Sequence, residues 1–125
     1  MNKILFLEDD KWFTDSIISF LGHDFEIRVC SDPEKVFKIL ENWLPDLLLA
    51  DVMLGAKNLF VLMNEMQSYI DTRNLNVVIL SSVASHVNQN DVTKFNVKKI
   101  LDKSKITPET LLKILMEVLE KGIQK

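Results

Sequence analysis

Several apolar segments of the chain end in residues that carry a charge or a hydroxyl group. The segment "ILFL" runs directly into three carboxylates, "LLLA" into an aspartate, "VVIL" into two serines, and "KIL" into an aspartate and a lysine. If these segments are parallel strands of one sheet, their carboxyl ends share an edge, where the side chains come together. The residues at these ends that can do chemistry are Glu8, Asp9, Asp10, Asp51, Ser81 and Lys103.

Such a cluster predicts a site for a hard divalent cation and a phosphoryl group. Acidic side chains that crowd together repel one another unless a cation offsets their charge. Oxygen ligands suit Mg²⁺, which keeps several waters and uses few carboxylates together with phosphate oxygens. A lysine and a hydroxyl group beside the ion can bind the other oxygens of a phosphoryl group. Only three glycines are present, which excludes glycine-rich phosphate loops.

The elements that would position this site alternate along the chain. Two of the apolar segments, "LLLAD" and "VVILS", are apolar up to their polar last residue, as strands covered on both faces are. Strands are predicted at residues 3–7, 26–30, 47–51, 77–81 and 100–102. Helices are predicted at residues 11–21, 33–44, 58–70 and 108–121, with a short or mobile helix at 85–95. This alternation predicts an α/β fold with a doubly wound parallel sheet.

Capping residues support the helix boundaries. Asp10 precedes the first helix, Asp32 and Pro33 begin the second, and Thr107 begins the last. Gly22 follows the first helix as a C-terminal stop. Asp10 is therefore interpreted as a helix cap.

The segments "LFLEDD", "PDLLLADVML", "VVILSS" and "ILDKS" together resemble the receiver domain of two-component response regulators. The resemblance covers essentially the whole chain, so residues 1–125 are expected to form a single receiver domain. It implies a flavodoxin-like, five-stranded parallel sheet with strand order 2-1-3-4-5.

The resemblance also implies a role for each residue. Asp51 matches the phosphoacceptor, and Ser81 and Lys103 match the switch hydroxyl and the lysine of the active site. The metal ligands implied for Mg²⁺ are Glu8, Asp9, Asp51 and the backbone carbonyl of Met53.

What the resemblance implies for function is phosphoryl transfer from a histidine kinase or phosphotransfer protein to Asp51. The protein would then be a signalling module and not an enzyme beyond self-phosphorylation and slow autodephosphorylation. Phosphorylation would switch a protein-interaction face toward a downstream target or an output domain, and a homodimer is possible. Neither contact with nucleic acid nor contact with a membrane is expected.

Several positions depart from the family pattern. Leu54-Gly55 and Asn58-Leu59 replace a Met-Pro and an Asp-Gly pair, Ile100 replaces the switch aromatic, and Ser104 replaces a proline. Whether these changes alter output switching is open, and the cognate kinase is not indicated.

Two alternatives remain. A degenerate receiver would act through phosphorylation-independent protein contacts. The departures from the family pattern favour this alternative, whereas the complete set of acids and lysine argues against it. An aspartyl-phosphate hydrolase or a Toprim-type phosphoryl-transfer enzyme would use an Asp-x-Asp pair, but the second position here is Met53.

Composition restricts the class of protein further. The hydrophobic fraction is 47%, the charged fraction is 26% and the net charge is −3, which is typical of a globular domain without a basic surface. The single cysteine, Cys30, excludes an internal disulfide and is expected to pack as a small apolar residue. No segment resembles a signal peptide, so the cytoplasm is the expected location.

Overall fold

The computed structural model of the protein describes residues 1–54, 57–82 and 95–123. Its main sheet has five strands in the order β2-β1-β3-β6-β7, and every neighbouring pair is parallel. Numbered within this sheet, the order is 2-1-3-4-5, which confirms the expected fold. The strands are β1 (Asn2–Leu7), β2 (Phe25–Cys30), β3 (Leu47–Ala50), β6 (Asn76–Ser81) and β7 (Val97–Asp102).

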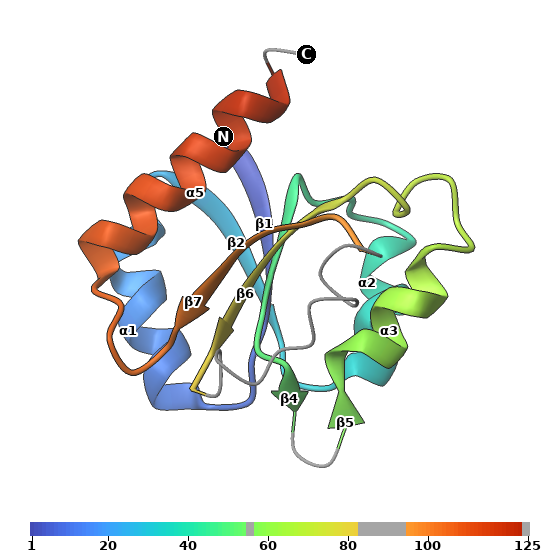
Figure 1. Ribbon diagram of the computed structural model, residues 1–125, viewed down its shortest axis with the longest axis horizontal. Helices are drawn as coiled ribbons and strands as arrows, with labels where there is room; N and C mark the ends of the chain where they lie inside the picture. Colours follow the sequence, from blue (N-terminus) through green and yellow to red (C-terminus); the bar gives the residue numbers. More distant parts are fainter. Residues whose placement is uncertain (55–56, 83–94, 124–125) are drawn as a thin grey trace.

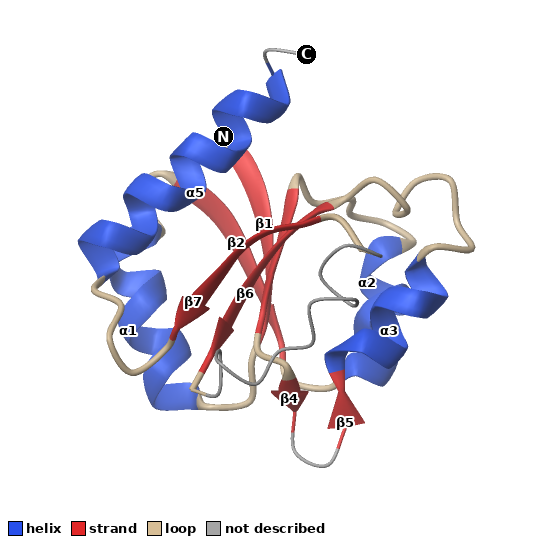
Figure 2. Ribbon diagram, viewed as in Figure 1, coloured by secondary structure: helices blue, strands red, loops and turns tan. Residues whose placement is uncertain are grey.

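The register brings the ends of the five strands to one edge, where Figure 2 shows the arrowheads of β6 and β7 side by side. Leu7 is level with Cys30 on one side and with Ala50 on the other. Ser81 is level with Asp102 at the end of the last pair. The residues that follow these strands therefore meet at the carboxyl edge of the sheet.

Helices cover both faces of the sheet (Figure 1). Helices α1 (Lys11–Leu21) and α5 (Pro108–Ile123) lie on one face, and α2 (Val36–Leu40) and α3 (Leu59–Met66) lie on the other. Alternate residues of β1 serve the two faces, because successive side chains of a strand point in opposite directions. Ile4 and Phe6 pack with α1 and α5, whereas Leu5 and Leu7 pack with α2 and α3.

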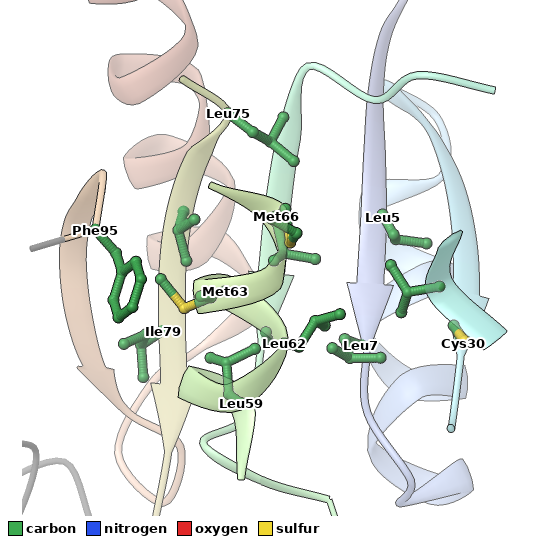
Figure 3. Close-up of a cluster of buried hydrophobic side chains, with 14 of the residues drawn as sticks. Leu5, Leu7, Cys30, Leu59, Leu62, Met63, Met66, Leu75, Ile79 and Phe95 are labelled. Carbon is green, nitrogen blue, oxygen red and sulfur yellow. The ribbon is translucent and has the colours of Figure 1, made fainter. Parts of the chain in front are cut away.

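The core under α3 is drawn in Figure 3. Leu59, Leu62, Met63 and Met66 of this helix pack against the sheet, and each is at least 96% buried. Cys30 belongs to the same cluster and is 5% exposed, which confirms that it packs as an apolar residue. Burial raises the pKa of its thiol further above the ordinary range, although its Sγ also donates to the carbonyl of Asp32.

The predicted helix caps are confirmed. Asp10 Oδ1 accepts a hydrogen bond from the Phe13 N–H at 3.2 Å, and Asp32 Oδ1 accepts one from the Glu34 N–H at 3.0 Å. Thr107 Oγ1 accepts from the Thr110 N–H at 3.2 Å. Gly22 ends α1, but its φ of −65° is right-handed. Glycine is required there because a Cβ would lie only 2.7 Å from the Ile18 carbonyl oxygen.

Some boundaries differ from the expectation. A 3₁₀ turn (η1, Pro33–Lys35) precedes α2, which ends at Leu40, four residues before the predicted end. Helix α3 ends at Met66, whose carbonyl accepts a hydrogen bond from Thr72 Oγ1, and β7 begins three residues earlier than predicted.

A short hairpin that was not predicted follows β3. Its two antiparallel strands, β4 (Met53–Leu54) and β5 (Lys57–Asn58), have two residues each. The helix expected at 85–95 lies almost wholly outside the described residues. Among the described helices, none is long and apolar enough to cross a membrane.

Candidate phosphoryl and metal site at the carboxyl edge

Three of the candidate residues are fixed by a backbone hydrogen bond to the neighbouring strand. The Glu8 N–H donates to the Cys30 carbonyl at 3.1 Å, and the Asp51 N–H donates to the Leu7 carbonyl at 3.1 Å. The Lys103 N–H donates to the Ser81 carbonyl at 3.0 Å. These bonds continue the parallel ladders by one residue, so the main chain of the site is as well ordered as the sheet that carries it.

Lys103 brings the charged side chains together. Its Nζ lies 2.8 Å from Glu8 Oε1 and 3.5 Å from Asp51 Oδ2. The side chains of Lys103, Glu8 and Asp51 are 16%, 0% and 12% exposed, so this ion-paired group is largely shielded from water. The ends of β1, β3 and β7 therefore meet in one charged cluster, as the strand-end pattern predicts.

Glu8 is the most deeply buried acid of the cluster. Its Oε2 accepts hydrogen bonds from the Asp9 N–H at 3.1 Å and the Asp10 N–H at 3.0 Å, while Oε1 faces Lys103. Burial raises the pKa of Glu8 above its ordinary value, although Lys103 and the backbone bond favour the charged form. Oε2 thus has two backbone donors, whereas the buried Oε1 has the ion pair with Lys103 and, among the described residues, no hydrogen bond.

Lys103 is held in its charged form by its acidic neighbours. Burial acts to lower the pKa of this lysine, but the ion pair with Glu8 and the charges of Asp51 and Asp10 outweigh it. The net effect is a pKa above the ordinary value for lysine. An ammonium that stays charged beside two carboxylates can neutralise negative charge that arrives with a phosphoryl group.

Asp51 presents its carboxylate at the edge of the sheet. Its Oδ1 accepts a hydrogen bond from the Met53 N–H at 3.2 Å, and its Oδ2 faces Lys103. The residue is 9% exposed, so its two oxygens are oriented by the protein and still lie near the surface. Met53 lies in the hairpin strand β4, with a side chain that is 43% exposed.

The three acids after β1 differ in their surroundings, and the predicted helix cap among them is confirmed. Asp10 is the cap of α1, and the exposed Asp9 lies between this cap and the buried Glu8. Negative charge at a helix N-terminus is favoured by the helix dipole as well as by the free amides.

The donor set of the edge fits magnesium by its chemistry. The side chains of Asp9 and Asp51 and the carbonyl of Met53 supply oxygen alone, which is the ligand type that Mg²⁺ prefers. Within the described part of the chain, no three His, Cys, Asp or Glu side chains converge closely enough to hold an ion by themselves.

The hydroxyl predicted for the site lies at its edge but is enclosed. Ser81 ends β6 and is fully buried, whereas Ser82 is exposed. Ser81 is level with Asp102, directly before Lys103. Ile100 of β7 is half-buried and packs against the core under α3.

Two departures from the family pattern have clear structural roles. Asn58 caps α3, since its Oδ1 accepts a hydrogen bond from the Phe60 N–H at 2.8 Å. Ser104 donates to Asp102 Oδ1 twice, from its Oγ at 2.6 Å and from its N–H at 2.9 Å. Proline has neither a hydroxyl group nor a backbone N–H and could make neither bond. Gly55 lies outside the described residues.

One residue of the site is not apparent from the sequence pattern. Phe13 of α1 is half-buried and packs against the core, and its ring centroid lies 4.7 Å from Lys103 Nζ. Helical periodicity identifies an apolar face, but it carries no information about a lysine ninety positions along the chain. The sequence offered one indication of its position: Phe13 lies three residues after the predicted cap Asp10, and in the structure its N–H donates to that cap.

The fold is similar to receiver domains of known structure. A CheY-like response regulator receiver domain from Methanospirillum hungatei has a TM-score of 0.86 and 19% identity, covering 99% of this chain and 98% of that chain. The BeF3-activated N-terminal receiver domain of RstA from Klebsiella pneumoniae has a TM-score of 0.77 and 26% identity, covering 94% and 98%.

A third similar structure contains a metal ion. It is the receiver domain of a sensor histidine kinase from Pseudomonas aeruginosa, with magnesium coordinated in its active site cleft. Its TM-score is 0.81 at 18% identity, covering 95% of this chain and 98% of that chain. No protein-family model and no curated protein matches the sequence itself. The resemblance indicated by the strand-end residues is nevertheless confirmed in three dimensions: over nearly its whole length, the chain has the fold of a response regulator receiver domain.

Proposed function

We propose that this protein is a phosphorylatable receiver that accepts a phosphoryl group on Asp51. The observation that carries the proposal is the position of Lys103, whose ammonium is shared between Glu8 and Asp51 at the carboxyl edge. A carboxylate that is oriented by a backbone N–H and flanked by a buried ammonium is suited to attack phosphorus.

In the proposed reaction, an Asp51 oxygen forms a bond to the phosphorus of a phosphohistidine. The nitrogen–phosphorus bond breaks, and its electron pair stays on the imidazole of the donor. The Met53 N–H, through its bond to Oδ1, fixes the rotation of the Asp51 carboxylate. Lys103 then lies on the side of Oδ2, where it can bind an oxygen of the transferred group.

Magnesium is the cofactor that this site would hold. The proposed oxygen donors are Asp9, Asp51 and the carbonyl of Met53, with Glu8 adding negative charge because both of its oxygens are already engaged. When bound, the ion neutralises charge on the phosphoryl oxygens. The similar receiver with magnesium in its cleft supports this assignment.

The partners of a receiver would be a histidine kinase or phosphotransfer protein and a downstream target or output domain. The phosphoryl group on Asp51 would draw on the hydroxyl of Ser81, which ends β6, the strand directly beside β3, and so bias a two-state surface. Such partners would place the protein in the cytoplasm.

Incubation with acetyl phosphate and Mg²⁺, followed by intact-protein mass spectrometry, tests the proposal. The wild type should gain the mass of one phosphoryl group, and Asp51→Asn should gain none. Asp24→Asn is a matched control, because Asp24 is exposed and lies in the turn after α1, away from the site. Modification that does not require Mg²⁺, or that survives Asp51→Asn, would overturn the proposal; no modification at all would favour a phosphorylation-independent contact module.

A further inference from the structure

The ammonium of Lys103 has a third neighbour besides its two carboxylates. The ring of Phe13 lies with its centroid 4.7 Å from Nζ, within the range of a cation–π interaction. Glu8 Oε1 at 2.8 Å and Asp51 Oδ2 at 3.5 Å are the other two neighbours. The ring therefore occupies a side of the ammonium that water would otherwise reach.

The ring is itself held in place from two directions. The N–H of Phe13 donates to Asp10 Oδ1 at 3.2 Å, which fixes the first turn of α1. Its ring meets the ring of Phe6 edge to face, with centroids 6.2 Å apart and an interplanar angle of 73°. Phe6 is fully buried in β1, so the orientation of the Phe13 ring is set by the core of the protein.

We infer that Phe13 is a positioning residue for Lys103. Its ring face keeps the ammonium between Glu8 and Asp51 and limits the number of conformations open to the long lysine side chain. Lysine has a flexible four-carbon stem, and ordering this stem costs conformational entropy. The contact with a fixed ring face compensates for part of that cost. Phe13 contacts neither substrate nor metal in this role and acts only through Lys103.

Ordinary core packing is the competing explanation, and it makes a different prediction. Leucine at position 13 would retain much of the apolar contact with Phe6 but would present no π face to the ammonium. Tyrosine would retain both the contact and the face. If packing alone matters, the effect of leucine should therefore be the same whether residue 103 is lysine or methionine.

A readout that does not depend on phosphorylation tests the contact itself. The aromatic ring current should shift the NMR signals of the Lys103 Hε protons upfield in the wild type and in Phe13→Tyr. The shift should be absent in Phe13→Leu. Lys105 serves as the internal reference, because its side chain is 83% exposed and bonds only weakly to Asp102. Wild-type protein without the shift would overturn the inference, whether or not Asp51 accepts phosphate.

A second readout tests the consequence for the reaction, and it rests on the proposed function. With acetyl phosphate and saturating Mg²⁺, Phe13→Leu should slow phosphorylation about three- to tenfold, as expected for loss of one cation–π contact. Phe13→Tyr should stay within about twofold of the wild type, because it retains the contact. In a Lys103→Met background, Phe13→Leu should have no further effect.

These outcomes separate the two proposals. Equal slowing by leucine and tyrosine, or slowing that persists in the Lys103→Met background, would overturn the positioning role. A wild-type protein that shows the ring-current shift but takes up no phosphoryl group would leave Phe13 as a positioning residue for Lys103 and overturn the proposed function instead.

Discussion

Two polar clusters lie at opposite ends of the same sheet, and they satisfy their buried groups in different ways. At the amino end of β6 and β7, neutral groups bond to one another. Asn96 Nδ2 donates to the Asn74 carbonyl at 3.0 Å and to Asn76 Oδ1 at 3.1 Å, and Thr72 Oγ1 donates to the Met66 carbonyl at 2.7 Å. We call these residues the neutral cluster.

At the carboxyl end, the charged cluster consists of Glu8, Asp51 and Lys103. Here two largely buried carboxylates share one ammonium, so negative charge is in excess. Neutral hydrogen bonds each contribute about 1 kcal/mol to stability and respond little to ions. A buried excess of charge costs stability and is relieved by binding a cation, so only the charged cluster has the character of a binding site.

The largest expected effect comes from removing the shared ammonium. Lys103→Met removes the ammonium that pairs with the buried Glu8 carboxylate, and we expect the free energy of unfolding to fall by about 2–3 kcal/mol, somewhat below the value for a fully buried pair. Urea unfolding in the absence of Mg²⁺ measures this loss. Adding Glu8→Gln should restore most of it. A loss below about 1 kcal/mol, or a double variant as unstable as the single one, would show that the pair is not effectively buried.

Magnesium should act on the charged cluster alone. An ion that binds only the folded protein stabilises it by about 1.4 kcal/mol when its free concentration is tenfold above the dissociation constant. This gain should appear in the wild type and in Thr72→Val and be lost in Asp9→Asn. Thermal unfolding with increasing Mg²⁺, compared with the same titration of Asp24→Asn, provides the measurement. A gain that Asp9→Asn retains would place the cation elsewhere.

The charged cluster could be predicted in part because its acids interrupt apolar segments. A buried strand that runs into several carboxylates is conspicuous, and parallel topology brings such ends together. Assigning Asp10 to the helix cap was also possible, since capping depends on residues three positions apart. These features are local, and local patterns are what a single sequence displays.

The partners of Lys103 could not be predicted in the same way. Nothing in the spacing indicates that its ammonium lies closer to Glu8 than to Asp51, or that the Phe13 ring faces it. Both are tertiary contacts between residues that lie far apart in the sequence. The β4–β5 hairpin was missed for a related reason, because two-residue strands have no detectable periodicity.

The neutral cluster offers a smaller effect of a different kind. Thr72 is 5% exposed, and its hydroxyl donates a hydrogen bond to the Met66 carbonyl at the end of α3. Thr72→Val preserves the shape but removes this donor, so we expect a loss of about 1 kcal/mol. The loss should be the same with and without Mg²⁺, and phosphorylation of Asp51 should proceed at the wild-type rate. A loss that depends on Mg²⁺ would mean that the two ends of the sheet are coupled.

The smallest expected effect concerns the exposed turn that leads from β7 into Lys103. The side-chain hydroxyl of Ser104, followed by its N–H, holds the pKa of Asp102 below its ordinary value of 3.8. A carboxylate whose pKa is lower in the folded protein stabilises it above the unfolded pKa, and this contribution is lost as the pH falls through the folded pKa. Ser104→Ala removes the hydroxyl donor, so the variant should be slightly less stable than the wild type at neutral pH.

The pH dependence distinguishes this bond from a general defect in the turn. Once Asp102 is protonated in both proteins, the difference in unfolding free energy between wild type and Ser104→Ala should shrink toward the residual effect of a neutral hydroxyl. Ser104→Thr, which keeps the hydroxyl, is the matched control. Urea unfolding at neutral and at acidic pH measures both differences. A difference that is unchanged in acid would mean that Ser104 shapes the turn without stabilising the Asp102 charge, and the excess charge of this edge would then be confined to the buried cluster.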